Sequence, residues 1–197
     1  MRIPRLSPTL TKTAALYFAV FCFTSLASGQ SFFKKPEINV FAGYSLLRFD
    51  SVPLGYSQTL NLHGGNVEVS LPDLYQGLGI VADFSGHHGP QAEQFNFMIG
   101  PQYRHEVKSV QLFGNLLFGK TRTRLLQVGT SLLEPSTVGY SVAFGGGVDV
   151  PLGQRFSIRA LQADYLVNSA FGDKRHNMRY STGVVIRFGK KSEAPSF

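Results

Sequence analysis

The chain has 197 residues, of which 43% are apolar and 16% are charged, with 17 Phe, 21 Gly, one Cys and no Trp. This length is enough for one domain with a core, and the apolar content excludes a disordered chain. One Cys excludes an internal disulfide and a zinc site built from several thiolates. The net charge is +7, but +3 of it lies in the first 29 residues, so we expect no nucleic acid partner.

Residues 1–29 have the pattern of a secretory signal peptide. Three basic residues among the first twelve precede a short apolar run at 14–23, and small residues follow at 27–29. We expect cleavage after Gly29. The alternative is an uncleaved anchor helix, but such a helix needs roughly 20 apolar residues. Cys22 follows a bulky Phe, which argues against a lipidated N-terminus.

After a short lead-in at 30–36, the chain alternates apolar and polar residues with the two-residue period of β-strands. Near the C-terminus, for example, Val184, Ile186 and Phe188 share one face, and Arg187 lies on the other. The eight alternating segments are Glu37–Leu47, Asn61–Leu71, Leu74–Phe84, Gln94–Arg104, Ser109–Lys120, Val138–Val150, Arg155–Val167 and Met178–Gly189.

The two faces of these segments differ in a way that is typical of a barrel in a membrane. The polar face is mostly Gly, Ser, Asn and Gln, whereas the apolar face is nearly free of charge and carries Tyr near segment ends. A closed barrel also satisfies every backbone polar group in hydrocarbon. We therefore predict an all-β fold, an eight-stranded antiparallel up-and-down transmembrane β-barrel at 37–189, followed by a polar tail at 190–197.

The predicted connections alternate between long and short, as in barrels with long external loops and tight periplasmic turns. An even number of strands places both ends of the barrel on the periplasmic side. In order, the predicted connections are Arg48–Leu60, Pro72–Asp73, Ser85–Glu93, Glu106–Lys108, Thr121–Thr137, Pro151–Gln154 and Asn168–Asn177.

The seventh segment contains a conflict of alternation. If the pattern of Phe156 and Ile158 continues, Gln162 and Asp164 face the lipid, where a charge costs up to a few kcal/mol. We predict a β-bulge near Leu161 that turns both side chains inward. The alternative is that Asp164 lies in water at the outer rim.

Six pieces of the sequence resemble the small outer-membrane β-barrel domain family, which is related to the membrane domain of outer-membrane protein A. They lie in order at 40–48 (VFAGYSLLR), 77–86 (GLGIVADFSG), 97–104 (FMIGPQYR), 144–150 (FGGGVDV), 159–166 (RALQADYL) and 182–189 (TGVVIRFG). The resemblance implies an eight-stranded barrel in a Gram-negative outer membrane. It also implies a terminal aromatic signal for the insertion machinery, which we assign to Phe188 and not to Phe197.

Charged residues on the inward face form a predicted lumen network, because unpaired buried charges are expensive and a barrel of this size is filled by side chains. The alternative use of such a network is a narrow ion path or a gate. Its members are Glu68, Asp83, Arg104, Asp149, Arg159 and Arg187.

Lys120, Arg122 and Arg124 share the parity of Phe118 and are predicted to point outward, just above the lipid band. Guanidinium groups bind phosphate well, so we expect a contact with lipopolysaccharide there. A solvated extension of the strand is the alternative.

We predict no catalytic, cofactor or metal site. Neither a Gly-x-Ser-x-Gly motif nor a Ser–acid pair of matching parity accompanies His63, and the adjacent His87 and His88 in a predicted loop would chelate a metal poorly. The glycines at 145–147 lie within a strand and are not a phosphate loop.

The sequence therefore predicts a monomeric, non-enzymatic outer-membrane protein with a structural or surface-interaction role. Its partners would be outer-membrane lipid and lipopolysaccharide, the barrel-insertion machinery and periplasmic chaperones. Eight strands are too few for a solute channel, which uses 16–18. The alternatives are an outer-membrane lipid-modifying enzyme and a soluble secreted ligand-binding barrel.

Overall fold

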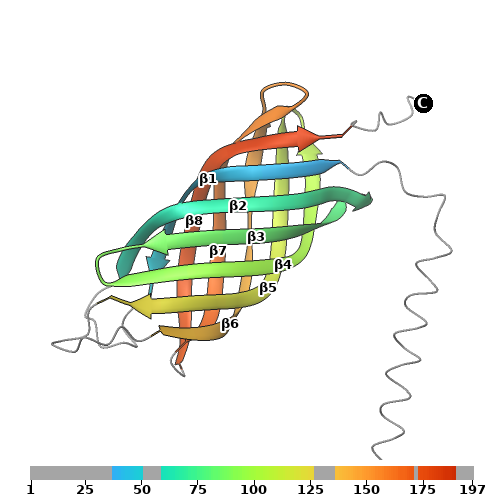
Figure 1. The fold of residues 1–197 in the computed structure, drawn as a ribbon. Helices are drawn as coiled ribbons and strands as arrows, with labels where there is room; N and C mark the ends of the chain where they lie inside the picture. Colours follow the sequence, from blue (N-terminus) through green and yellow to red (C-terminus); the bar gives the residue numbers. More distant parts are fainter. Residues whose placement is uncertain (1–36, 51–58, 127–135, 171–172, 190–197) are drawn as a thin grey trace, which may run out of the picture. The chain divides into compact units, whose positions relative to one another are not determined.

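The eight strands of the chain close into one barrel in which every sequence neighbour pairs antiparallel and β8 pairs with β1 (Figure 1). The computed structural model describes residues 37–50, 59–126, 136–170 and 173–189, so the predicted segments 1–29, 30–36 and 190–197 lie outside it. The strands are β1 (Ile38–Phe49), β2 (Leu60–Tyr75), β3 (Leu78–His88), β4 (Ala92–Val107), β5 (Val110–Leu125), β6 (Ser136–Pro151), β7 (Phe156–Ala170) and β8 (Asp173–Phe188). The predicted fold class is confirmed.

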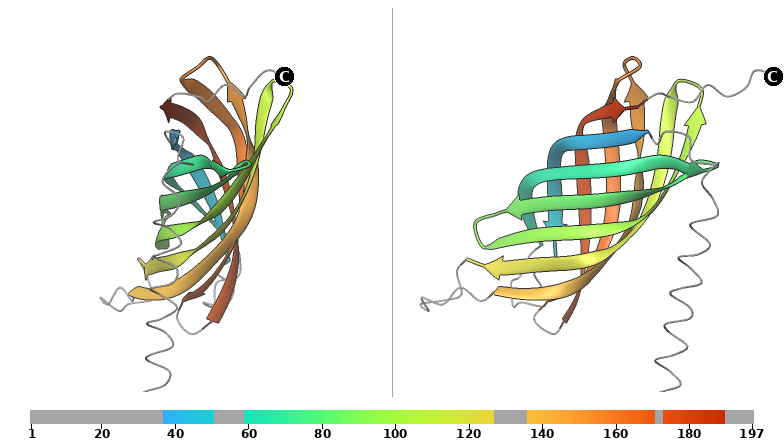
Figure 2. Two further views of the ribbon diagram at one scale, coloured as in Figure 1. Left: turned by 90° about the vertical axis from the view of Figure 1, so that its right-hand side faces the viewer. Right: turned by 45° about the vertical axis from the view of Figure 1, so that its right-hand side comes forward.

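The strands are strongly tilted around the barrel, as Figure 2 shows. One end of the barrel holds the start of β1, the end of β8 and the connections at 76–77, 108–109 and 152–155. We call it the turn end. The opposite end, which holds the other four connections, is the loop end. No helix that could span a membrane occurs in the residues described above.

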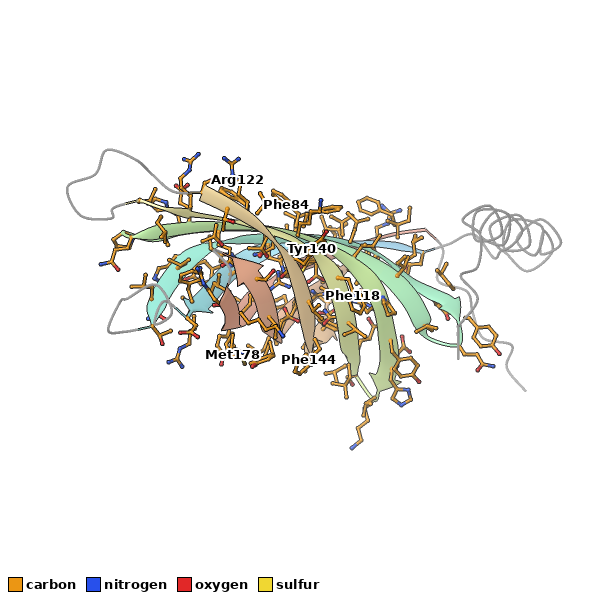
Figure 3. All side chains as sticks on the ribbon, turned by 90° about the horizontal axis from the view of Figure 1, so that it is seen from below. Phe84, Phe118, Arg122, Tyr140, Phe144 and Met178 are labelled. Carbon is orange, nitrogen blue, oxygen red and sulfur yellow. The ribbon has the colours of Figure 1, made fainter. Side chains whose placement is uncertain are left out.

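The apolar face of each strand points outward. Val67 is 45% exposed and Phe97 is 58% exposed, whereas Asn66 and Met98, their neighbours in sequence, are buried inside. Figure 3 shows the same arrangement for several labelled aromatic side chains, which lie on the outer side of the ribbons: Phe84, Phe118, Tyr140 and Phe144. A soluble barrel with an apolar interior would have the reverse arrangement.

Strand β7 contains a β-bulge at Ala160 and Leu161, whose side chains are both exposed. The pairing with β6 skips one residue between Arg159 and Leu161, and the pairing with β8 shifts at the same place. The extra residue reverses the alternation, so Gln162 and Asp164 are fully buried in the lumen. The predicted bulge is confirmed, and the alternative of Asp164 in water at the outer rim is wrong.

The turn between β2 and β3 lies at Gln76 and Gly77, so the predicted turn at Pro72–Asp73 is wrong. Both turn residues have positive φ, 47° and 83°, as the favoured two-residue hairpins require. Pro72 lies where the pairing of β2 with β3 is irregular, a position that tolerates the missing N–H. Asp73 also serves the turn, because its Oδ1 accepts a hydrogen bond from the N–H of Gly77 at 2.9 Å.

Two predicted loops at the loop end are mostly strand. β3 continues to His88 and β4 begins at Ala92, while β7 ends at Ala170 and β8 begins at Asp173. The strict alternation of long and short connections is therefore wrong. Backbone hydrogen bonding continues past the apolar band because it does not require an apolar face. A prediction from the alternation of apolar and polar residues therefore ends the strand too early.

The seam between β1 and β8 depends on two inward-facing glycines, Gly43 and Gly183, which lie opposite each other. A Cβ atom on Gly43 would lie 2.1 Å from the carbonyl oxygen of Thr182 and 2.7 Å from the ring of Phe41. Both distances are too short, so the strands approach closely only because these residues lack a side chain.

We expect Gly43→Ala to lower the free energy of unfolding by roughly 1–3 kcal/mol, because the added methyl group overpacks the seam. Urea titration followed by circular dichroism measures this. The matched control is Gly65→Ala on the neighbouring β2, where the nearest atom to the new Cβ lies 3.6 Å away, and stability should be unchanged. Equal midpoints for the two variants would contradict the packing account.

Candidate functional site

The turn-end half of the lumen is filled by a cluster of ion pairs around Arg159. Its guanidinium donates to Glu68 at 2.5 Å and to Asp149 at 2.8 Å, and Arg104 donates to the same Asp149 at 3.1 Å. These residues come from four different strands, β2, β4, β6 and β7. Two of these pairs, Arg159–Glu68 and Arg104–Asp149, connect strands that are not hydrogen-bonded neighbours, whereas Arg159 and Asp149 lie opposite each other on the adjacent strands β7 and β6.

Arg159 is also held between two aromatic rings. Its guanidinium carbon lies 4.2 Å from the ring centroid of Phe41 and 4.2 Å from that of Phe113. Gly147 makes room for one of these rings, since a Cβ there would lie 2.7 Å from Phe113. Cation–π contacts and charged hydrogen bonds therefore hold the same fully buried guanidinium.

A second cluster surrounds Arg179 on β8. Its guanidinium makes two hydrogen bonds of 2.8 Å to Asp83 and also donates to Asp164 at 2.8 Å. Gln162 joins this cluster to the first, because its amide donates to Glu68 at 2.7 Å and to Asp164 at 2.9 Å. The charged groups thus form one connected network, which we call the lumen network.

The structure brings five of the six predicted lumen residues into this network and places the sixth, Arg187, elsewhere. Arg187 lies near the turn end, where it donates to Gln111 at 3.1 Å and to Ser157. Sequence reasoning missed Arg179 and the buried Arg175, although both share the parity of Arg187 on the last strand. That shared parity was a sufficient signal for Arg179, whereas Arg175 lies in the predicted connection Asn168–Asn177, to which the strand pattern did not apply.

Above the lumen network, toward the loop end, most interior side chains are uncharged, with the exception of Arg175, whose guanidinium carbon lies 5.4 Å from the ring centroid of Phe49. Uncharged polar side chains such as Gln94, Asn96 and Thr121 are fully buried there. Leu47, Phe49, Leu62, Ala92 and Leu125 pack together as an apolar cluster at the loop end. Charged, neutral polar and apolar side chains thus all contribute to the interior of the strands that the structure describes.

The buried His87 is paired with a serine but not with an orienting carboxylate in the part of the chain that the structure describes. His87 and His88 lie in β3 and not in a loop, and His87 is buried, with Nε2 2.9 Å from the hydroxyl of Ser45. A nucleophile system needs a carboxylate that orients the base, but Nδ1 of His87 has no hydrogen-bond partner. On the outer face of the barrel, Nδ1 of His63 and the hydroxyl of Tyr44 form a hydrogen bond of 2.5 Å. In the described ranges no three His, Cys, Asp or Glu side chains are grouped to hold a metal.

The predicted outer basic residues all lie on the exterior of β5, toward the loop end. Lys120, Arg122 and Arg124 alternate with the buried Thr121 and Thr123. Arg122 and Arg124 line a shallow depression of about 220 Å³ together with Glu93 and Phe95 of β4. Figure 3 shows Arg122 nearer the loop end than Phe118.

Phe188, the predicted insertion signal, is the last residue of β8 and pairs with Ile38 at the start of β1. Its ring is 52% exposed on the outer wall at the turn end. An aromatic side chain at the closing seam is therefore accessible from outside the barrel.

We expect Arg159→Leu to lower the free energy of unfolding by roughly 3–5 kcal/mol, because it removes the arginine that pairs with the buried Glu68 and leaves Asp149 with Arg104 alone. The matched control is Arg155→Leu, four residues earlier in an exposed turn, which should change stability little. Urea titration of both variants measures the difference. If Arg159→Leu unfolds at the wild-type urea concentration, the lumen network does not hold the barrel together.

Solved structures show the same architecture. Neisserial surface protein A matches with a TM-score of 0.56 and 12% identity, over 77% of this chain and 96% of that chain. Ail, the attachment invasion locus protein of Yersinia pestis, matches with a TM-score of 0.53 and 20% identity, over 79% and 100% of the two chains. Ail in complex with the heparin analogue sucrose octasulfate matches with a TM-score of 0.56 and 19% identity, over the same shares.

No family model and no curated protein matches the sequence. At identities of 20% and below, the likeness to the solved structures concerns the fold. It agrees with the resemblance that the six sequence pieces carry. The chain has the fold of the small eight-stranded outer-membrane β-barrels.

Proposed function

We propose that this protein is an integral outer-membrane barrel of a Gram-negative bacterium with a structural or surface-interaction role and no enzymatic activity. The observation that carries the proposal is the direction of the side chains. Apolar residues cover the outer wall, and the ion pairs lie inside. Only a surrounding hydrocarbon phase makes that distribution favourable, because water would penalise the exposed apolar wall.

The dimensions of the outer wall support the proposal. On β5, the outward residues from Val110 to Phe118 are apolar or Gly, and Lys120 ends the band. Nine residues at about 3.4 Å each, tilted by about 40°, span roughly 20 Å, close to the apolar band of outer-membrane barrels. Exposed tyrosines also lie on the outer wall, where Tyr103 pairs with Gly114 within this band and Tyr140 pairs with Lys120 at its loop-end border.

The filled lumen supports a role on the surface over a role in transport. The lumen network and the apolar cluster at the loop end occupy the interior. Interaction with other molecules is then left to the loop end and to the outer wall. Among the structural neighbours, the printed name of Ail, attachment invasion locus protein, refers to such a surface role.

The proposal includes the partners of assembly and of residence. An exported chain reaches the membrane from the periplasm with chaperones and is inserted by the barrel machinery, for which Phe188 is the proposed signal residue. It then resides as a monomer among outer-membrane lipid and lipopolysaccharide. The turn end faces the periplasm and the loop end faces the exterior, as in barrels of this architecture.

Fractionation and cysteine labelling test this proposal. The protein should sediment with the outer membrane and migrate differently on a gel before and after boiling, because a detergent-resistant barrel stays folded until heated. In a Cys22→Ser background, Ser136→Cys at the loop end should react with a membrane-impermeant maleimide on whole cells. Ser109→Cys at the turn end should react only after the outer membrane is permeabilised.

Recovery of the wild-type protein in the soluble periplasmic fraction, with no heat-dependent shift, would overturn the membrane assignment. Labelling of Ser109→Cys on whole cells would overturn the orientation while leaving the barrel intact.

A further inference from the structure

Three basic side chains form a ladder on the outside of β5 that begins where the apolar wall ends. Lys120 pairs across the sheet with Phe97 and Tyr140, and Arg122 pairs with Phe95 and Val138. Arg124, one step further, pairs with Glu93 and Ser136. These side chains therefore extend from the hydrocarbon boundary into the headgroup region.

The three basic side chains of the ladder differ in whether they form an ion pair with a described side chain. Glu93 lies 2.9 Å from Nδ1 of His88, and its second oxygen lies 3.7 Å from Arg124. Arg122 and Lys120 make no ion pair with any side chain that the structure describes. The depression between β4 and β5 thus presents one guanidinium beside a carboxylate, Arg124, and one guanidinium available for an anion, Arg122, which pairs across the sheet with Phe95.

Most of the outward-facing charged side chains that the structure describes on the strands at the loop end are basic. Among the strand side chains described there, a single acid, Glu93, accompanies five outward-facing basic residues: Arg48, Lys120, Arg122, Arg124 and Lys174. The turn end is mixed, with Asp73 and Glu106 as well as Lys108 and Arg155 exposed. The two rims therefore face environments of different charge, and the loop end favours an anionic one.

The geometry points to a binding site for a phosphate group of a glycolipid, the lipid A moiety of lipopolysaccharide, in the depression lined by Glu93, Phe95, Arg122 and Arg124. This inference rests on the proposed outer-membrane location. Arg122 donates to the phosphate oxygens through its planar fork, Lys120 adds a point charge below it, and the acyl chains lie along Phe95 and Phe97. Arg124 contributes less, because Glu93 shares its charge.

Native mass spectrometry of the folded protein in detergent, titrated with lipid A, tests the site. The variant Lys120→Ser/Arg122→Ser should bind lipid A roughly tenfold or more weakly than the wild type, because charged hydrogen bonds to the phosphate are lost. The matched control, Lys108→Ser/Arg155→Ser, removes the same charge from the turn end and should bind as the wild type does. Each variant is first shown to give the heat-dependent gel shift.

Glu93→Gln tests the charge argument in the opposite direction. It removes a negative charge from the depression, so lipid A should bind about twofold to fivefold more tightly. A residue that served only folding would not strengthen binding when neutralised. No change, or a loss of affinity, would contradict the assignment of Glu93.

Two further probes identify the source of the phosphate. Lipid A from which both phosphates have been removed should bind the wild type roughly tenfold more weakly, and inorganic phosphate alone should not saturate the site in the millimolar range. The inference would be overturned if dephosphorylated lipid A bound as tightly as lipid A, or if inorganic phosphate alone saturated the site in the millimolar range. Unchanged binding by a correctly folded Lys120→Ser/Arg122→Ser variant would overturn it as well, without affecting the membrane assignment.

Discussion

The enclosed charge of the lumen is the constraint on which the rest of the structure depends. Eight strands leave an interior just wide enough for side chains, and this chain fills it with guanidinium and carboxylate groups that must find one another. Arg159 and Arg179 each pair with two carboxylates, and Gln162 connects the two clusters. Two of these contacts, Arg159–Glu68 and Arg179–Asp83, join strands that share no backbone hydrogen bonds, so they fix the relative positions of those strands. Inward glycines, such as Gly43 and Gly147, provide the space that the large side chains need.

The outer wall follows a separate physical rule. Its composition changes along the barrel axis from apolar and aromatic to basic, and it needs no internal partners because its surroundings solvate it. The residue types on the inner and outer faces are therefore almost independent of each other, because successive side chains of a strand point to opposite faces. The charged interior therefore does not limit which residues the outer face carries. In the proposed membrane, the position of an outward residue along its strand decides whether its side chain contacts acyl chains, headgroups or water.

The hydropathy pattern predicted the fold class, the number of strands and the outward direction of the apolar face, because lipid and lumen impose opposite demands on adjacent residues. It located strand ends poorly. Pro72 and Asp73 are residue types typical of turns, but they lie at an irregularity within β2. His87 lies near the end of β3, where the outward residues are no longer apolar and the alternation of apolar and polar residues stops. Most of the lumen network followed from parity, and the inward turn of Asp164 followed from the energetic cost of a charge in lipid. Partner choice did not follow, since parity names the inward charges but not the distances between them.

The bulge of β7 decides which side chains of the second half of this strand face the interior, and it places Asp164 there. Two half-strands with opposite alternation meet at Ala160, so the second carboxylate of Arg179 appears on the inner side. In evolution, a single-codon deletion at Ala160 or Leu161 would remove the bulge and still leave Gln162 and Asp164 facing inward, because one residue would then lie opposite one residue of β8 between Arg159 and Gln162. Alignments of such barrels should therefore read a gap here as the loss of a bulge and not as a change of the residues inside.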